Sequence, residues 1–336
     1  MKRISQRDIA KILGVNVSTI SRALRGLEGV GADLREKIER LAEDHGYRPN
    51  PFAASLRYDT TKTIGIVVPD ISFNHYAHIV KCMENEAKKV GYMCIITDSD
   101  DRYENEVDCI EHLLNMHVEG IAICISQETN KYDHLQKVKD QKIPLVLFDR
   151  AADLNVSSVV INDVDSAREV THYLIDSGAR RIAFVGGSNR MKQTSDRKHG
   201  YLEALRERNI PIRKELVKCH NASYNSGLTD TIELFNQPEK PDAIIASHGI
   251  LAVSAFQALI SQGYRIPDDV AFVGYMSDWI SDVSRPRMSF VKQNLKEIGT
   301  KTFKLLYEQL QGDERVKRMV IKAHLELRES TKKIHQ

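Results

Sequence analysis

The stretch GVNVSTISRALRG, residues 14–26, gathers short hydroxyl and amide side chains and two arginines along one predicted helix. Small polar side chains let a helix backbone approach base edges closely, and an arginine can donate two hydrogen bonds to one guanine. The spacing therefore indicates recognition of a DNA major groove, with Arg22 as the guanine-reading side chain. The same pattern also fits an ordinary small helical hairpin with a solvated face.

A second set of polar side chains follows apolar runs further along the chain: Asp70, Ser72, Gln127, Asp149, Arg150, Asp163, Arg197, His248 and Trp279. Charged and planar groups suit the hydroxyls of a sugar or other polyol, and an aromatic face suits its apolar side. Asp163 and Arg150 could equally form structural ion pairs. Trp279 could equally pack within a loop.

Three short helices are expected to position the first set. Ser5 and Asp8 form a predicted capping box that begins a helix, which ends at Gly14. Asn16 is placed as the N-cap of the second helix. The residues of this helix expected to face inward are Val17, Ile20, Ala23 and Leu24. Those expected to face outward are Ser18, Thr19, Ser21, Arg22 and Arg25. A third helix spans about 33–45. Two short helices joined by a glycine-containing turn predict a helix-turn-helix.

The stretch YRPNPFAASLR follows, in which Asn50 and Pro51 indicate the start of a helix of one to two turns. A helix this short needs an outside partner, such as DNA or a second copy of itself. Leu56 beside Arg57 suggests an apolar wedge and a cation for a minor groove. The alternative is an ordinary interdomain linker.

From Thr63 onward, apolar runs alternate with amphipathic helices, which predicts an α/β architecture of βαβ units. Eight runs are typical of parallel strands buried on both faces: TIGIVVP, YMCIITD, GIAICIS, PLVLFD, SVVIND, RIAFVGG, PDAIIAS and VAFVGY. Eight strands suit two sheets, divided near residue 160. Because open parallel sheets bind ligands beyond their strand carboxyl ends, the cleft between two lobes is the expected pocket for the second set.

Composition and charge narrow the class of protein. The chain has 336 residues, with 42% hydrophobic and 28% charged residues, which is typical of globular domains. No apolar run reaches the roughly 18 residues that span a bilayer, and no signal peptide is visible, so a cytoplasmic location without membrane contact is expected. Five scattered cysteines favour reduced thiols over disulfides or a metal site. Residues 1–30 carry six basic and two acidic side chains, which favours a nucleic-acid partner although a solvated charged face is equally possible.

The segments ISQRDIAKILGVNVSTISRALRG, LAEDHGYRPNPFAASLR, TIGIVVPDIS and HLELREST resemble the lactose-repressor (LacI/GalR) family of bacterial transcription regulators over nearly the whole chain. The resemblance implies an N-terminal helix-turn-helix domain (1–48), a hinge helix and linker (49–60), and an effector and dimerisation domain (61–336). The last has the two-lobed periplasmic-binding-protein fold, with lobes of about 61–160 with 291–320, and 161–290.

The resemblance also assigns roles to side chains. It implies DNA base contacts by Val17, Ser18, Arg22 and Leu56, phosphate contacts by Ser5, Asn16, Thr19, Ser21 and Asn50, and effector contacts by Asp70, Ser72, Gln127, Asp149, Arg197, His248 and Trp279. Gly31 stands where the family usually has a serine N-cap. His248 and Gly249 replace a usual Asn-Asp pair, and Met276 replaces a usual aspartate. Two usual sugar-binding carboxylates are therefore missing, which favours an anionic effector such as a sugar acid or phosphosugar.

Together these features predict a regulator, with an enzyme and a stand-alone sugar-binding protein as alternatives. FVGGSN lacks the spacing of a dinucleotide- or phosphate-binding loop, and no hydrolase or metal-ligand motif is present. We expect no cofactor and no metal. The partners expected are a double-stranded DNA operator, a small carbohydrate-type effector and a second copy of the chain, since one recognition helix reads only a few base pairs. The ending LRESTKKIHQ shows no long leucine heptad, which favours a homodimer over a coiled-coil tetramer.

Overall fold

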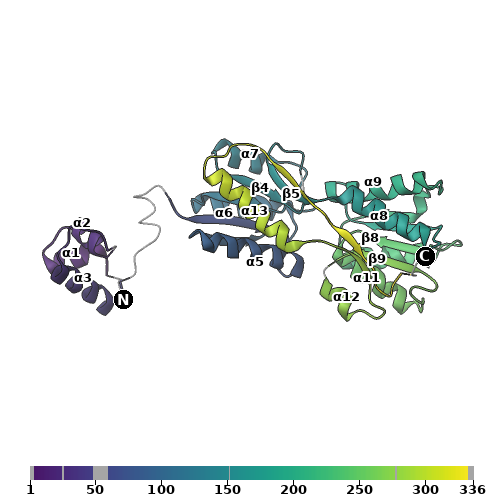
Figure 1. Cartoon of the computed structure of the whole chain (residues 1–336), viewed down its shortest axis with the longest axis horizontal. Coiled ribbons are helices and arrows are strands. Elements are labelled where there is room, and N and C mark those ends of the chain that lie inside the picture. The colour runs from purple at the N-terminus through teal and green to yellow at the C-terminus, as the bar shows by residue number, and fades with distance from the viewer. Residues whose placement is uncertain (1–3, 25, 48–59, 151, 277, 332–336) are drawn as a thin grey trace. The chain divides into compact units, whose positions relative to one another are not determined.

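The computed structural model describes residues 4–24, 26–47, 60–150, 152–276 and 278–331. The chain divides into two compact units, residues 1–61 and 62–336. The first is helical and the second is built from two α/β lobes (Figure 1). The predicted fold class is confirmed.

The first unit is a three-helix core of α1 (Gln6–Leu13), α2 (Val17–Ala23) and α3 (Ala32–Asp44). The predicted capping box is present, because the Ser5 hydroxyl accepts the Asp8 amide at 3.3 Å and Asp8 Oδ2 accepts the Ser5 amide at 2.9 Å. Gly14 ends α1 with a left-handed φ of 63°. Gly31 is the N-cap of α3. The interior is formed by two apolar residues from each helix: Ile9, Ala10, Ile20, Ala23, Ile38 and Ala42.

The first lobe of the second unit contains a six-stranded sheet in the order β11-β5-β4-β3-β1-β2, with every recorded pair parallel. Its strands are β1 (Thr63–Val68), β2 (Met93–Asp98), β3 (Gly120–Ile123), β4 (Leu145–Phe148), β5 (Ser157–Ile161) and β11 (Arg318–Ile321). Its helices are α5 (Asn74–Lys89), α6 (Tyr103–Asn115), α7 (Asp133–Asp140) and α13 (Leu295–Leu310).

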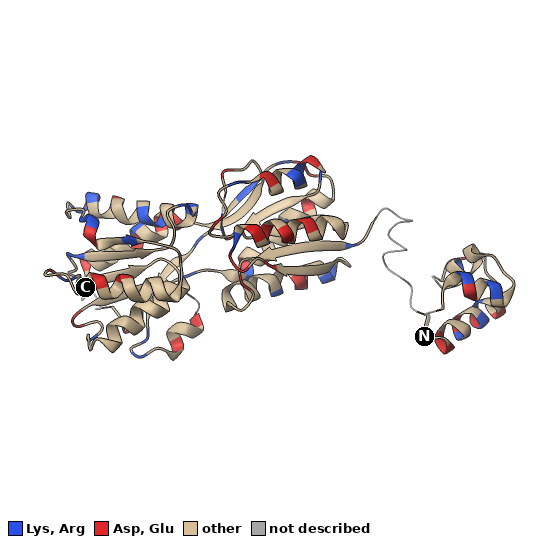
Figure 2. Cartoon of the chain, turned by 180° about the vertical axis from the view of Figure 1, so that it is seen from behind, with Lys and Arg blue, Asp and Glu red and all other residues tan. Residues whose placement is uncertain are grey.

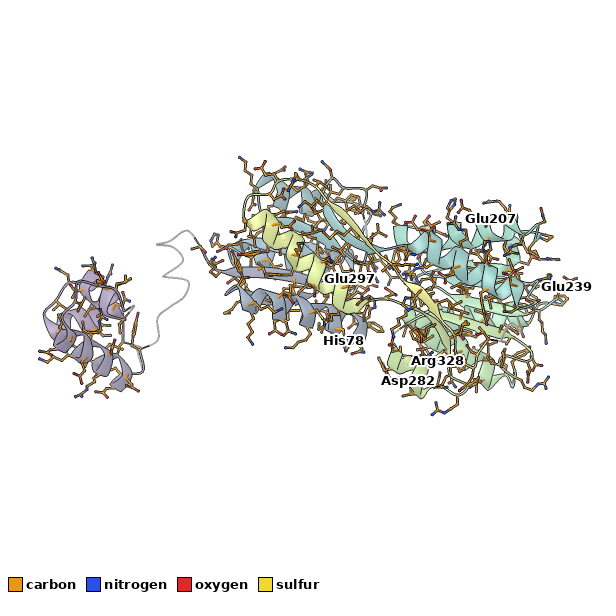
Figure 3. All side chains as sticks on the ribbon, viewed as in Figure 1. His78, Glu207, Glu239, Asp282, Glu297 and Arg328 are labelled. Atoms are coloured by element: carbon orange, nitrogen blue, oxygen red, sulfur yellow. The ribbon has the colours of Figure 1, made fainter. Side chains whose placement is uncertain are left out.

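Helix α13 lies near the end of the sequence but packs on α5 in the first lobe (Figure 1). A Cβ on Gly299 of α13 would lie only 2.5 Å from the Ile79 carbonyl oxygen of α5, so the two backbones are in direct contact. His78 and Glu297 mark the two helices in Figure 3. A residue larger than glycine at 299 would force these helices apart.

The second lobe contains a six-stranded sheet in the order β12-β10-β9-β8-β6-β7. Its strands are β6 (Ile182–Gly186), β7 (Val217–Cys219), β8 (Ala243–Ala246), β9 (Ala271–Tyr275), β10 (Ser289–Lys292) and β12 (His324–Glu326). Its helices are α8 (Asp163–Asp176), α9 (Lys192–Glu207), α10 (Tyr224–Phe235), α11 (Gly249–Ser261), α12 (Asp278–Val283) and the short 3-10 helix η1 (Lys214–Leu216).

Three connections join the lobes: β5 to α8, β10 to α13, and β11 to β12. The first and third are tied together, because the Ala323 amide donates to the Asn162 side-chain oxygen at 2.7 Å. After β12 the chain stays on the second lobe, where the Ser330 hydroxyl donates to the Phe272 carbonyl at 2.6 Å. Small changes at these three connections can therefore change the angle between the lobes.

Four strands were not predicted: β7, β10, β11 and β12. Each has only three or four residues and contains one Lys, Arg or Glu side chain, so none forms a long apolar run. The eight predicted strands pair in parallel, as expected. The expectation of burial on both faces is wrong for β2, an edge strand with exposed residues, and the pair β10 and β12, which was not predicted, is antiparallel.

Candidate functional site

Helix α2 carries most of the side chains predicted to touch DNA. Ser18 and Arg22 are exposed, whereas Val17 and Thr19 are half-buried. The prediction that Ser21 faces outward is wrong, since Ser21 is only 8% exposed. Ser21 lies four residues after Val17, which places it on the inward stripe of the helix. The exposed side of α2 therefore presents a short hydroxyl and one long cation.

Asn16 begins α2 through its backbone alone. Its carbonyl accepts the amides of Thr19 at 2.9 Å and Ile20 at 3.2 Å, but its exposed side chain makes no capping hydrogen bond, contrary to the prediction. The Ser5 hydroxyl also donates to Asp8 Oδ2 at 2.7 Å. Basic and acidic side chains both occur along these helices (Figure 2). Asn50, Leu56, Arg25 and the predicted hinge helix lie outside the described residues.

The predicted effector residues meet in one cavity of about 600 Å³ in the second unit. It is lined from the first lobe by Asp70, Ser72, Gln127 and Asp149, and from the second by Arg197, His248 and Trp279. Further lining residues that the sequence analysis did not name include Phe73, His75, Tyr76, Asp101, Gln193, Tyr275 and Gln293. The loops after parallel strands converge here, as the topology requires.

Asp149 is an ionised carboxylate in the first-lobe wall of the cavity. His75 Nε2 donates to its Oδ1 at 3.0 Å. Burial alone would raise the pKa of Asp149, but His75, Arg150 and Arg197 outweigh burial and lower the pKa to about 2. Asp149 also has a left-handed φ of 62°, a conformation that costs energy for a residue with a Cβ. The carboxylate is thus held charged at a fixed position, ready to accept hydroxyl hydrogen bonds.

Arg197 is the largest fully buried side chain of the described residues, at 1% exposure. Its Nε donates to Asp163 Oδ1 at 2.7 Å, and its Nη1 donates to the Ser247 carbonyl. Its guanidinium carbon lies 3.9 Å from the centre of the Tyr275 ring, a cation–π contact. Burial raises the pKa of Asp163 to about 6 despite the arginine. Asp163 is therefore engaged in a structural ion pair, one of the two alternatives left open for it, and it lies behind Arg197, which borders the cavity.

His248 is neutral at pH 7. Burial, and then the charges of Arg197 and Arg150, hold its pKa well below the usual value. Its Nδ1 lies 2.8 Å from the Ser247 hydroxyl. Within the described part of the chain, His248 Nε2, Arg197 Nη2 and Gln293 Oε1 have no hydrogen-bond partner. Because buried polar atoms are normally satisfied, these three atoms are candidates for contact with a bound polar molecule.

Gln127 joins the two lobes. Its side-chain oxygen accepts a hydrogen bond from the Ala222 backbone amide of the second lobe at 2.8 Å. The backbone amide of Gln127 donates to Asp101 Oδ1 at 2.8 Å. Asp101 also pairs with Arg150, whose Nη1 lies 2.5 Å from Oδ1. Arg150 is thus engaged in a structural ion pair, one of the two alternatives left open for it. The side-chain oxygen of Gln127 is already committed in this conformation.

The remaining predicted residues also border the cavity. Asp70 Oδ1 accepts the Ser72 amide at 2.8 Å, which shapes the loop after β1. Trp279 on α12 is 51% exposed, so part of its ring is free to stack on a sugar face. Among the described lining residues, four are aspartates (Asp70, Asp100, Asp101 and Asp149) and two are arginines (Arg150 and Arg197).

No candidate metal cluster of three or more His, Cys, Asp or Glu side chains occurs within the described ranges. None of the described helices is long and apolar enough to cross a membrane.

Comparison with known proteins identifies both units. Residues 6–50 match the family of bacterial regulatory proteins, lacI family, and residues 61–329 match the periplasmic binding proteins and sugar binding domain of the LacI family. Catabolite control protein A of Priestia megaterium is 30% identical over 332 residues, covering 97% of this chain and 98% of that protein. The HTH-type transcriptional regulator DegA of Bacillus subtilis is 27% identical over 96% of this chain and 97% of that protein.

Solved structures give the same result. The transcriptional regulator CelR in complex with cellobiose has a TM-score of 0.75 at 27% identity, covering 98% of this chain and 100% of that chain. The lac repressor dimer bound to operator and the anti-inducer ONPF has a TM-score of 0.84 at 22% identity, covering 98% of this chain and 99% of that chain, which is a likeness of fold. These relatives are regulators rather than enzymes.

Proposed function

The chain belongs to the LacI family of bacterial transcription regulators, and we propose that it is a repressor that binds a pseudopalindromic double-stranded DNA operator as a homodimer under the control of a carbohydrate. The observation that carries this proposal is the pairing of a three-helix DNA-binding unit with a two-lobed unit that contains a polar cavity. Neither an enzyme nor a stand-alone sugar-binding protein has a use for the helical unit. Such a regulator works in the compartment that holds the genome, so a cytoplasmic location follows.

The recognition surface proposed is the exposed side of α2. Val17, Ser18 and Arg22 read base edges, and Ser5, Asn16, Thr19 and Ser21 fix phosphates. Because Ser21 is buried, its hydroxyl can contact a phosphate only if the DNA lies directly against the backbone of α2. A helix of seven residues spans only about two turns, so it reads few base pairs. Two copies related by a two-fold axis double the site.

The dimer contact proposed lies in the second unit. Edge strand β2 presents Met93, at 68% exposure, and Ile96 beside an unpaired strand edge. Val283 at the end of α12 is equally exposed on the second lobe. Exposed edge strands and apolar side chains invite pairing with another chain. A second copy of this chain is the occupant that a two-fold operator requires.

The hinge proposed comprises residues 49–60, which follow the three helices in the sequence and precede the second unit. Asn50 would contact a phosphate, and Leu56 from each subunit would insert at the operator centre. Closure of the two lobes on a ligand would change the spacing of the paired hinges and thereby the affinity for DNA. A hundredfold change in affinity requires a coupling of about 2.7 kcal/mol, which the ordering of one short helix per subunit could supply.

The effector proposed is a carbohydrate bound in the interlobe cavity. Asp149 and the other carboxylates of the first lobe compensate for the aspartates that the sequence lacks near His248 and Met276. Arg197 is already paired with Asp163, and His248 is neutral. A neutral polyol is therefore favoured over the sugar acid or phosphosugar that the sequence suggested, because four aspartates would repel an anion.

Selection of DNA from the source genome tests the DNA-binding part. The purified protein is incubated with sheared genomic DNA at moderate salt, and the retained fragments are sequenced. We expect enrichment of a pseudopalindrome with a flexible central step. If no fragment is enriched, with or without the sugars below, the proposal is wrong.

Titration with sugars tests the effector part. Trp279 is the one tryptophan in the sequence and lines the cavity, so its fluorescence reports ligand binding directly. Neutral mono- and disaccharides, including cellobiose, are compared with matched uronates and sugar phosphates. Saturable quenching by a neutral sugar supports the proposal, and a consistent preference for the anionic partner contradicts it.

A further inference from the structure

We propose that the loop segment before α3 (residues 26–31) positions Arg22 for base reading through its backbone, which makes Gly29 a determinant of operator specificity. This inference rests on the proposed function, in which Arg22 reads a base. It assigns a positioning role to loop residues for which no DNA contact is proposed.

The guanidinium of Arg22 is held by one carbonyl. Its Nε donates to the Glu28 oxygen at 3.2 Å, and its Nη2 donates to the same oxygen at 2.9 Å. A guanidinium has five N–H donors arranged in a planar fork. The carbonyl occupies the edge formed by Nε and Nη2. The other edge, formed by Nη1 and Nη2, is the one that can donate two parallel hydrogen bonds to the O6 and N7 acceptors of guanine.

This hold prepares Arg22 before DNA arrives. Arg22 is exposed, and an exposed arginine without a partner samples many rotamers, which must be frozen when it binds a base. The Glu28 carbonyl restricts the guanidinium to one plane in the free protein. A base pair that matches the preset fork is then favoured over a base pair that would require the side chain to move.

The loop that provides the carbonyl is tied to both flanking helices. The Leu27 amide donates to the Arg22 carbonyl at 3.0 Å, which fastens the loop to α2. Arg35 Nη2 of α3 donates to the Leu27 carbonyl at 2.5 Å, which fastens it to α3. The position of the Glu28 oxygen is therefore set by the packing of the helices, and Arg35 contributes to it.

Gly29 makes room for this arrangement. Its φ is +93°, and a Cβ added there would lie 3.2 Å from Arg22 Nη2 and 3.5 Å from Arg22 Cζ. That approach is closer than ordinary van der Waals contact, so the guanidinium would have to shift by a few tenths of an ångström. Gly26 in the same loop also has a positive φ, of +67°, but nothing lies within 4 Å of its added Cβ. Alanine at 26 thus also places a side chain at a positive φ, but without touching Arg22.

The test measures base discrimination by the full-length protein. Fluorescence anisotropy gives the affinity for the selected operator and for operators substituted symmetrically at each half-site base pair. Wild type is expected to lose about tenfold or more at the base pair that Arg22 reads. Arg22→Ala should abolish discrimination at that base pair only.

Gly29→Ala is expected to reduce discrimination at the same base pair at least about threefold, while Gly26→Ala leaves it unchanged. Affinity for non-specific DNA should be the same in both variants, which shows that the helical unit remains folded. Should Gly29→Ala fail that check, Arg35→Met serves instead, since it loosens the loop without adding backbone strain, and it should reduce the same discrimination.

Equal discrimination by the wild type, Gly29→Ala and Arg35→Met would overturn the inference and leave the proposed function intact. If Arg22→Ala itself changes no base preference, base reading by Arg22 is wrong and the positioning role falls with it. The two failures are therefore distinguishable.

Discussion

Replacing Arg197 by methionine removes the positive half of a fully buried ion pair. Methionine keeps much of the length of the side chain but offers no donor to Asp163 Oδ1, which Arg197 Nε contacts at 2.7 Å. The carboxylate would then be left buried and unpaired, and the Ser247 carbonyl would lose a donor. Breaking a buried pair by removing one partner costs about 3–5 kcal/mol. We expect a loss of this size in the free energy of unfolding of the second unit.

Urea unfolding followed by tryptophan fluorescence measures this loss, because Trp279 is the only tryptophan in the sequence and lies in the second unit. Arg265→Met is the matched control. Its pair with Asp269 is as short, at 2.6 Å, but the Arg265 side chain is 72% exposed. Exposed pairs contribute little because solvent screens them. A second variant, Arg197→Met with Asp163→Leu, should recover most of the stability, since replacing both charges by apolar groups is close to neutral.

A loss of unfolding free energy in Arg197→Met no larger than that in Arg265→Met would contradict this prediction. The prediction also fails if the double variant is less stable than Arg197→Met alone, because the unpaired carboxylate would then not be the source of the cost.

Three further predictions follow from the site and the hinge. Asp163 has a folded pKa of about 6 and an ordinary value of 3.8, so the folded state binds more protons between these values; the contribution of Asp163 to the free energy of unfolding should fall by about 2 kcal/mol as pH rises from 4 to 6.5, and urea titrations of Asp163→Asn should show a much flatter profile. Gln127→Ala removes the acceptor of the Ala222 amide, so native-state hydrogen exchange at Ala222 should accelerate about tenfold or more, and unchanged protection would mean that this interlobe bond is not maintained in solution. Leu56→Ala should weaken operator binding without changing the unfolding curve, and an unchanged operator affinity would refute the wedge role.

Local signals in the sequence predicted the start and end of α1, because a cap depends on residues a few positions apart. Ser5 and Asp8 are three residues apart, and Gly14 closes the same short helix. Strands such as β1 and β9 could also be predicted from the sequence, since burial on both faces demands a continuous apolar run. Strand β12 was missed because its three residues carry no such run and depend on pairing with β10.

The location of the cavity could be predicted from the sequence, but the hydrogen bonds around it could not. Strand ends in a parallel sheet converge whatever their sequence, so Asp149 and Arg197 were predicted to share a cleft. The partner of Asp149 is His75, which is 74 residues away and lies in a helix with no distinctive pattern. The bond from Ala222 to Gln127 likewise depends on how the two lobes meet. The burial of Ser21 shows that polarity alone does not set the facing of a short helix.

Control of DNA binding by the cavity is tested most directly by measuring operator affinity with and without a sugar that quenches Trp279. The selected operator is titrated with protein in the absence of sugar and at a saturating sugar concentration, and Trp279→Ala serves as the control that binds the sugar poorly. We expect the sugar to change operator affinity about tenfold or more, in either direction. The change should be smaller in Trp279→Ala at the same sugar concentration. Equal operator affinity with and without a sugar that demonstrably binds would contradict it.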